Sequence, residues 1–426
     1  MAEARPAMRP LLSLDDALLR LVAAAVPHRI TQTETLSTFD ALGRVLAQDV
    51  LATLDVPPED NTSMDGYALR AADVTCSGTV LPVSQRIPAG VVGHALQAGT
   101  AARIFTGGQV PAGADAVVIQ EQCEATVAHP ASQSDEGFGA VRINTVPSSG
   151  QWIRRRGEDV QHGAAVLHIG TRLTPQALGL AASVGAGQLT VLRRPRIAIF
   201  STGDELMMPG EALRPGAIYN SNRFVLRGLA QAAGCDFTDL GIVPDRLDAT
   251  RAALRKAAEA HDLIVTCGGV SVGDEDHLKP AAQAEGQLEH WQIAIKPGKP
   301  LAYGSIRRPD NTAALLVGLP GNPVSAFVTW LLAVSTVLRA LQGLPTALPK
   351  GLAVRADFDW GKPDKRREFL RVRFNAEGGL ELFPNQSSGV LTSAVWADGL
   401  LDNPPSHAIR MGDMVRFLPL AELVAR

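Results

Sequence analysis

The chain has 426 residues, of which 46% are apolar and 19% are charged, and its formal net charge is -3. This length exceeds that of one ordinary domain, so we expect roughly two to four domains, each with its own core. The near-neutral charge provides no bulk attraction to nucleic acid or to an anionic membrane, and we expect neither as a partner. The four cysteines form no Cys-x-x-Cys pair, which argues against a disulfide framework or a structural zinc site.

Two helical patterns open the chain. Residues 14–26 are amphipathic, and Ser13 followed by Asp16 is typical of a helix N-cap with an acidic first turn. Residues 38–48 carry the second pattern. No apolar run approaches the roughly 18 residues that a membrane helix needs, and Arg20 interrupts the region that would be a signal-peptide core. The sequence therefore predicts a cytoplasmic protein without a membrane span.

The next region is rich in short β-favouring runs separated by Gly and Pro. A polar loop at residues 61–68 enters a short strand, and four further runs lie at residues 80–83, 101–106, 116–120 and 140–144. This pattern predicts a small β domain. After it, three adjacent arginines at 154–156 precede Glu158 and Asp159, either as a site for an anion and a cation or as a solvated turn with local ion pairs.

Strand and helix patterns alternate from residue 196 to residue 343, which indicates βαβ units around a parallel sheet. We expect strands at 197–201, 236–243, 263–266 and 314–318, and helices at 223–233, 248–260 and 324–342. The turn after each strand carries hydroxyl, carboxylate or amide side chains. In a doubly wound fold these turns meet at one edge of the sheet, so they predict one polar pocket.

Two stretches of this region suggest what the pocket binds. The strand at 263–266 ends in Gly268 and Gly269, and three acidic residues follow at 274–276. Glycines let backbone N–H groups approach a phosphate, and carboxylates suit a divalent cation. Lys296 and Lys299, each followed by proline, add ammonium groups suited to phosphate or oxyanion recognition. The last segment, residues 351–426, has short strand patterns typical of a small β-barrel or sandwich.

Six motifs occur in the order found in one protein family. They are NTSMDGYA at 61–68, GEDV at 157–160, STGDEL at 201–206, GGVSVG at 268–273, KPGKP at 296–300 and GLPGNPVS at 318–325. With them the chain resembles, over essentially its whole length, the MoeA family of molybdopterin molybdenumtransferases, which includes the C-terminal part of gephyrin. Small departures are Thr62 and Ser63, where Ser and Ala are more usual, and Cys267, where a small hydroxyl residue is common.

The resemblance implies an elongated homodimer with a three-layer α/β/α molybdopterin-binding domain, an inserted small β domain and a C-terminal β-barrel. The implied division is 1–54 with 147–190 as a discontinuous dimerisation domain, then 55–146, 191–345 and 350–426. Such proteins are enzymes that insert molybdenum from molybdate into adenylylated molybdopterin, cleave the adenylate and release AMP, with Mg2+ as cofactor. Implied partner proteins are the molybdopterin adenylyltransferase and apo-molybdoenzymes.

The resemblance also implies site residues. Because the substrates are anionic, carboxylates in the pocket are explicable chiefly as metal ligands. Metal ligands are expected at Asp274, Asp276, Glu205 and Asp245. Catalytic roles fall to Asp65, Thr106, Glu205, Asp245, Lys296 and Lys299, with Asp65 and Thr106 arriving from the partner subunit. Substrate contacts are expected from Asp159, Ser201, Thr202, Gly268, Gly269, Ser271, Gly321, Asn322, Arg371 and Ser388.

Structural readings of the same residues stay open at this point. Asp65 also suits a turn cap ahead of Gly66, and Glu205 suits a helix first turn. Two other functions remain for the whole chain: a molybdopterin adenylyltransferase or nucleotide hydrolase on the same α/β domain, and a gephyrin-like scaffold without chemistry. The accessory β domains argue against the first, and the retained carboxylates and lysines argue against the second.

Overall fold

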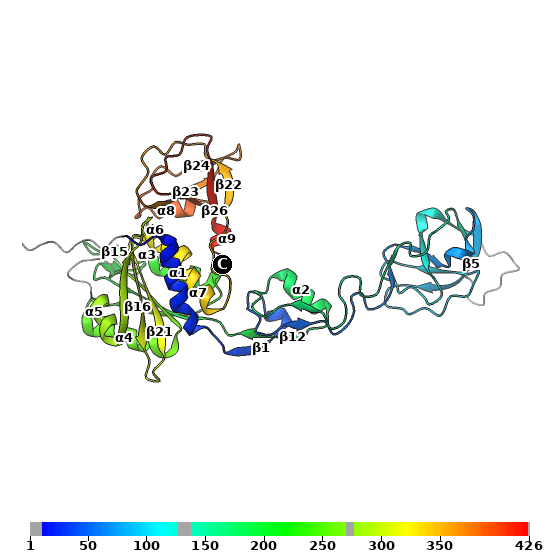
Figure 1. Ribbon diagram of the computed structural model, residues 1–426, viewed down its shortest axis with the longest axis horizontal. Coiled ribbons are helices and arrows are strands. Elements are labelled where there is room, and N and C mark those ends of the chain that lie inside the picture. The colour runs from blue at the N-terminus through cyan, green and yellow to red at the C-terminus, as the bar shows by residue number, and fades with distance from the viewer. Residues whose placement is uncertain (1–10, 127–137, 270–276, 425–426) are drawn as a thin grey trace, which may run out of the picture. The chain divides into compact units, whose positions relative to one another are not determined.

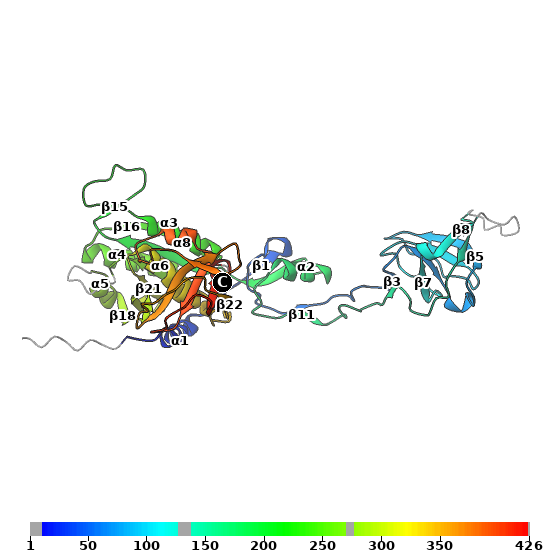
Figure 2. The same cartoon turned by 90° about the horizontal axis from the view of Figure 1, so that it is seen from above.

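The computed structural model describes residues 11–126, 138–269 and 277–424. It divides into two compact units. The first contains Met1–Glu34, Gly43–Val45 and Leu192–Arg426, and the second contains Thr35–Leu42 and Leu46–Val191. Figures 1 and 2 show the helices and strands of each unit, which are described separately below.

The first unit is built on a six-stranded sheet with the order β16-β13-β17-β21-β20-β18. Four strands run parallel: β13 (Arg196–Thr202), β16 (Asp236–Val243), β17 (Leu263–Cys267) and β21 (Ala313–Leu319). β20 (Pro300–Arg307) and β18 (Gly286–Gln292) extend the sheet in antiparallel fashion. The four predicted strands are thus confirmed, whereas the antiparallel pair was not predicted.

Helices cover both faces of this sheet, and the side chains of β13 alternate between the two cores. Ile197 and Ile199 pack with α1 (Leu14–Ala25), α3 (Ser221–Ala232), α6 (Pro323–Thr329) and α7 (Ser335–Leu341). Ala198 and Phe200 pack with α4 (Leu247–Ala260) and α5 (Leu278–Glu285) on the other face. The period-2 alternation of a strand buried on both sides produces this arrangement. The predicted three-layer α/β/α domain is confirmed (Figure 1).

The first helix belongs to this α/β core. The N–H of Asp16 donates to Ser13 Oγ at 3.1 Å, so the predicted N-cap is confirmed. Leu14 and Leu21 are buried in the cluster that contains α7. The sequence-based division grouped residues 1–54 with 147–190, whereas this helix packs on the α/β domain. The remaining predicted domain boundaries stay predictions.

One long apolar helical stretch is buried in the same core. Residues Pro323–Leu341 form α6, a π-helical turn at Trp330–Val334 and α7, and they are long and apolar enough to cross a membrane by composition alone. The expectation that no run reaches this length was therefore wrong. Buried Ser and Thr side chains interrupt the apolar pattern in the sequence, and 89% of the window is buried inside the protein.

The C-terminal part of the first unit is a β domain around its own core. Its strands are β22 (Leu352–Arg355), β23 (Arg367–Phe374), β24 (Leu380–Leu382), β25 (Gly399–Asn403) and β26 (Met414–Pro419), with short helices α8 (Thr392–Trp396) and α9 (Leu420–Val424). The strand order is β19-β23-β25-β26-β22 with β24 paired beside β23, and a bridge between Ala356, just after β22, and Leu380 in β24 gives barrel-like closure. The two-residue strand β19 (Ile295–Lys296) pairs with β23, so the lysine motif joins the C-terminal sheet to the α/β domain.

The second unit contains the predicted β domain, a six-stranded sheet with the order β7-β4-β6-β5-β9-β8. Its strands are β4 (Gly66–Leu69), β5 (Thr79–Ile87), β6 (Ala101–Ile104), β7 (Ala116–Ile119), β8 (Cys123–Thr126) and β9 (Ala140–Ile143). Another core packs α2 (Pro175–Ser183) near the short pair β2 (Val50–Leu51) and β11 (Ala165–Leu167). Two more short pairs are β3 (Asn61–Thr62) with β10 (Ile153–Arg154), and β1 (Thr33–Ser37) with β12 (Gln188–Leu192).

The helix expected at residues 38–48 is wrong. Only a single 3-10 turn forms, at Thr38–Asp40. Gly43 then takes a left-handed conformation with φ of +74°, which an α-helix does not accommodate. Beyond it the N–H of Leu46 donates to Thr171 O at 2.9 Å. Tertiary backbone pairing has therefore overridden the local helical pattern.

Candidate active site

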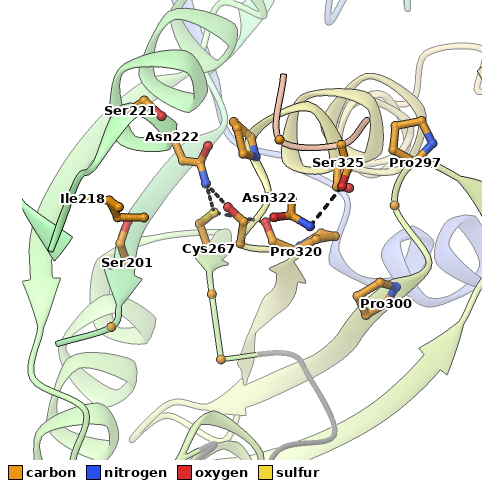
Figure 3. A pocket seen from close by; sticks show the side chains of 18 of the residues that line it. Ser201, Ile218, Ser221, Asn222, Cys267, Pro297, Pro300, Pro320, Asn322 and Ser325 are labelled. Carbon is orange, nitrogen blue, oxygen red and sulfur yellow. Dashed lines mark hydrogen bonds between the residues drawn. The ribbon is translucent and has the colours of Figure 1, made fainter. Parts of the chain in front are cut away.

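A pocket of about 1040 Å³ lies where the parallel strands of the α/β domain end and the C-terminal domain begins. Figure 3 shows its wall, to which β13, β17 and β21 each contribute the turn that follows them. Eleven residues predicted from the sequence line it: Ser201, Thr202, Glu205, Asp245, Gly268, Gly269, Lys296, Lys299, Gly321, Asn322 and Ser388. The prediction that the strand-end turns form one polar pocket is therefore confirmed.

Glycine is required at the floor of this pocket. Gly268 has a φ of +93°, and a Cβ built on it would lie 2.7 Å from Thr202 O. A Cβ on Gly321 would lie 3.9 Å from Gly268 Cα, so the two glycine turns are in contact. The N–H of Gly268 donates to Leu319 O at 3.2 Å. That N–H is thus used to join the turns, and it does not serve as the expected phosphate donor.

The two lysines of the pocket differ in their surroundings. Lys296 Nζ lies 3.2 Å from Glu368 Oε1 and 3.6 Å from Asp364 Oδ2, and Glu368 is fully buried. Lys299 lines the same wall, and no ion pair joins it to another described residue. Lys299 therefore has the ammonium group more available to an anionic ligand, while much of the charge of Lys296 is balanced within the protein.

Two carboxylates also line the pocket. Glu205 and Asp245 both contribute, and the N–H of Asp245 lies 3.5 Å from Asp204 Oδ1. Carboxylate oxygens are the ligands that Mg2+ prefers. No group of three His, Cys, Asp or Glu residues suited to a metal occurs within the described ranges. The other predicted ligands, Asp274 and Asp276, and the predicted substrate contact Ser271 lie outside those ranges.

Arg371 does not line the pocket. Its guanidinium is buried inside the C-terminal domain, where Nε donates to Ser393 Oγ at 3.1 Å and Nη1 donates to Phe369 O at 3.1 Å. Burial lowers the pKa of Arg371 to about 10. Its Nη2 lies 3.4 Å from Ser387 O, so Arg371 supports the pocket loop next to Ser388. The predicted oxyanion contact is replaced by an internal supporting role.

Arg366 lines the pocket instead, and the sequence reasoning missed it. Its guanidinium makes two hydrogen bonds to Asp364, at 2.9 and 2.8 Å. The side-chain hydrogen bond from Arg366 is the main cause that holds the pKa of Asp364 below its usual range, with Lys296 adding a smaller effect. A guanidinium already fixed by a carboxylate is well placed to orient a second anion. The alternating polar pattern around Arg366 and Arg371 gives no signal of which one faces the pocket.

Three predicted residues belong to the second unit. Asp65 Oδ1 accepts two hydrogen bonds from Thr106, from its N–H and from its hydroxyl, both at 2.7 Å. The backbone hydrogen bond from Thr106 is the first cause that lowers the pKa of Asp65, followed by the hydroxyl bond. Asp159 is exposed in the same unit. The structure thus joins Asp65 to Thr106, and the roles assigned to all three stay predictions.

Comparison with known proteins identifies the family. Family models match residues 12–185, described as MoeA N-terminal region (domain I and II), residues 198–340, described as probable molybdopterin binding domain, and residues 353–420, described as MoeA C-terminal region (domain IV). The chain is 38% identical over 355 residues to the molybdopterin molybdenumtransferase of Haemophilus influenzae, covering 83% of this chain and 84% of that protein. The chain belongs to the MoeA family.

Other MoeA-family proteins agree with this assignment. The molybdopterin molybdenumtransferase 2 of Mycobacterium tuberculosis H37Rv is 37% identical over 382 residues, covering 87% of this chain and 90% of that protein. The crystal structure of the molybdopterin biosynthesis MoeA protein from Pyrococcus horikoshii OT3 matches with a TM-score of 0.79 and 28% identity, covering 96% of this chain and 99% of that chain. The resemblance carried by the six sequence motifs is confirmed.

Proposed function

We propose that the protein inserts molybdenum from molybdate into adenylylated molybdopterin, with cleavage of the adenylate and release of AMP. The observation that carries this proposal is the joining of two glycine turns and the lysine motif in one pocket, in a chain of the MoeA family. The pocket is large enough for a drug-sized or larger ligand, and it lies where α/β sheets bind phosphate-containing molecules.

The charges of the pocket support separate binding roles for its residues. Adenylylated molybdopterin and molybdate are both anions, so their approach requires fixed positive charge. Lys299 and Arg366 supply it on the wall shared with the C-terminal domain. The hydroxyls of Ser325 and Ser388 line the pocket with them and are suited to orient oxyanion oxygens. We assign molybdate to this wall and the phosphate-bearing pterin to the glycine turns.

Magnesium is the cofactor that we assign to the pocket carboxylates. Glu205 and Asp245 line the pocket, and without a bound cation their carboxylates would repel an anionic ligand. Bound there, Mg2+ would supply Lewis-acid stabilisation of the phosphate oxygens. Asp274 and Asp276 complete the proposed ligand set.

We further propose a homodimer in which Asp65, Thr106 and Asp159 of one chain complete the pocket of the other. Two features support this. The three residues fall in a separate compact unit, and Asp65 and Thr106 are fixed to each other at an exposed site with no core role of their own. A cytoplasmic location and transfer from the molybdopterin adenylyltransferase to apo-molybdoenzymes are part of the same proposal.

The test is reconstitution with purified protein, Mg2+, molybdate and adenylylated molybdopterin. We expect AMP release together with a product that activates an apo-molybdoenzyme. A protein that binds these substrates without turnover would be a scaffold, and AMP formation from ATP alone would indicate a nucleotide hydrolase or an adenylyltransferase. Either result would contradict the proposal.

A further inference from the structure

Asn222, which the sequence reasoning did not single out, joins three turns of the pocket wall (Figure 3). Its Nδ2 donates to Cys267 Sγ at 3.0 Å and to Gly321 O at 2.7 Å. Both hydrogens of the amide are therefore used, one on each glycine turn. Asn222 lies in the first turn of α3, so the helix, the turn after β17 and the turn after β21 meet at this single side chain.

The thiol of Cys267 completes the junction. It is 3% exposed, and its Sγ lies 3.4 Å from Pro320 O. Burial raises the pKa of this thiol to about 12, so the thiol stays protonated at neutral pH. A protonated thiol can donate to Pro320 O while it accepts from Asn222. The two glycine turns are thus tied together directly and also through Asn222.

The side chain of Asn222 is not needed to begin the helix. The N-cap of α3 is Asn220, whose side chain accepts from the N–H of Arg223 at 3.2 Å. The turn after β21 also contacts the C-terminal domain, because Asn322 Nδ2 donates to Ser388 Oγ at 3.1 Å. Loss of the Asn222 amide would therefore release the pocket wall and leave the helix cap in place.

We propose that Asn222 is a positioning residue that holds Gly268 and Gly321 at the spacing that accepts the phosphate-bearing pterin ligand. This inference rests on the proposed function, in which that ligand occupies the glycine turns. Asn222 acts through the two turns and is not a catalytic residue. The effect of its removal falls on the pterin ligand, whereas molybdate is assigned to the wall formed by Lys299 and Arg366.

The experiment compares Asn222→Ala and the similarly branched, uncharged Asn222→Leu with the wild-type protein by equilibrium titration. Neither variant can donate the two hydrogen bonds. We expect the Kd for adenylylated molybdopterin to rise by about tenfold or more, as the loss of two modest hydrogen bonds implies. The Kd for molybdate should stay within about twofold. The matched control is Gln231→Ala, an exposed amide near the other end of α3, which should bind both ligands like the wild type.

A second measurement tests whether the contacts among Asn222, Cys267 and the two glycine turns loosen in the ligand-free protein. Iodoacetamide labelling of Cys267, measured by peptide mass spectrometry, should be several-fold faster in Asn222→Ala because the turns open more often. The hydrogen bond from Asn222 lowers the pKa of the thiol, so its loss alone would slow labelling. Faster labelling therefore reports opening of the wall and not a more reactive thiol.

The outcomes separate this inference from the proposed function. Weaker pterin binding and faster labelling in the variants support it. If Asn222→Ala does not fold, the similarly branched and uncharged Asn222→Leu decides, since a purely space-filling role predicts wild-type binding for it. If the wild type binds adenylylated molybdopterin and both variants bind it equally well, only the inference is overturned. If the wild type itself does not bind that ligand, the proposed function fails, and the inference fails with it.

Discussion

Lys296 and Glu368 form an ion pair across the boundary between the α/β domain and the C-terminal domain, with Nζ 3.2 Å from Oε1. Glu368 is fully buried, and its Oε2 also accepts from Trp360 Nε1 at 2.8 Å. The backbone pairing of β19 with β23 brings the two residues side by side. Lys296 therefore belongs to the connection between the domains as well as to the pocket.

We predict that Lys296→Ala and Lys299→Ala differ in their effect on stability. Lys296→Ala leaves a buried carboxylate with one partner fewer, and it should lower the free energy of unfolding by about 1–3 kcal/mol, less than for a fully buried pair because Lys296 is 38% exposed on its side chain. Lys299→Ala should change it by less than about 0.5 kcal/mol. Denaturant unfolding measures both, and isothermal titration should show weaker molybdate binding for Lys299→Ala. Equal stability losses would contradict the assignment.

We predict that the loss of protein stability at acid pH depends on Asp364. Its pKa is lowered in the folded protein, chiefly by the hydrogen bond from Arg366, so it contributes stability above the unfolded carboxylate pKa of about 3.9, and this contribution is lost as the pH falls through the folded pKa. We therefore expect wild type to melt at a higher temperature than Asp364→Asn at pH 6, with the difference shrinking below about pH 4. Thermal unfolding at a series of pH values measures it. A difference that is constant down to pH 2.5 would argue against the ion pair.

Gly268→Ala tests the floor of the pocket, with Gly241→Ala as its control. Both glycines have a left-handed backbone, with φ of +93° and +79°, but a Cβ has open space at Gly241 and would meet Thr202 O at Gly268. The control should lose about 1–2 kcal/mol from backbone strain alone. Gly268→Ala should lose more and should also bind adenylylated molybdopterin more weakly. Identical unfolding and binding curves for the two variants would show that the close approach is unimportant.

The shared pocket of the proposed homodimer predicts complementation between subunits. Asp65→Asn keeps an oxygen that accepts both hydrogen bonds from Thr106, so this variant should fold normally and lose activity through its charge. Mixed dimers of Asp65→Asn with Glu205→Gln contain one pocket with both changes and one intact pocket. Their activity should reach about half that of wild type, well above either homodimer. Mixed dimers that stay inactive would place both residues in the same chain's pocket.

The sequence predicted which turns form the pocket more accurately than it predicted the role of each residue. Gly268 and Gly321 follow strands whose continuous apolar pattern is unmistakable, and the parallel sheet then brings their turns together. The predicted substrate contact of Arg371 was wrong. The alternation of side chains along a strand does not say which face of the C-terminal sheet meets the pocket. Arg371 is enclosed by its own domain, while Arg366, just before β23, faces the cavity.

The sequence could not identify residues whose role depends on partners far away in the chain. Asn222 has the pattern of an ordinary polar residue in a helix first turn, and only the fold places Cys267 and Gly321 within reach of its amide. The strands β18 and β20 were missed for a similar reason, because each pairs antiparallel with its neighbour in the sheet and neither belongs to a βαβ unit. The helix predicted at 38–48 does not form because Gly43 adopts a left-handed backbone conformation. The helical pattern of the surrounding residues does not reveal this.

The most direct test of the transferase function is the ratio of AMP released to molybdenum incorporated. Purified protein is supplied with Mg2+, adenylylated molybdopterin and increasing molybdate, and AMP and pterin-bound molybdenum are measured in the same samples. We predict saturable dependence on molybdate and one AMP for each molybdenum incorporated. AMP release that proceeds at the same rate without molybdate, with no molybdenum in the product, would contradict the account.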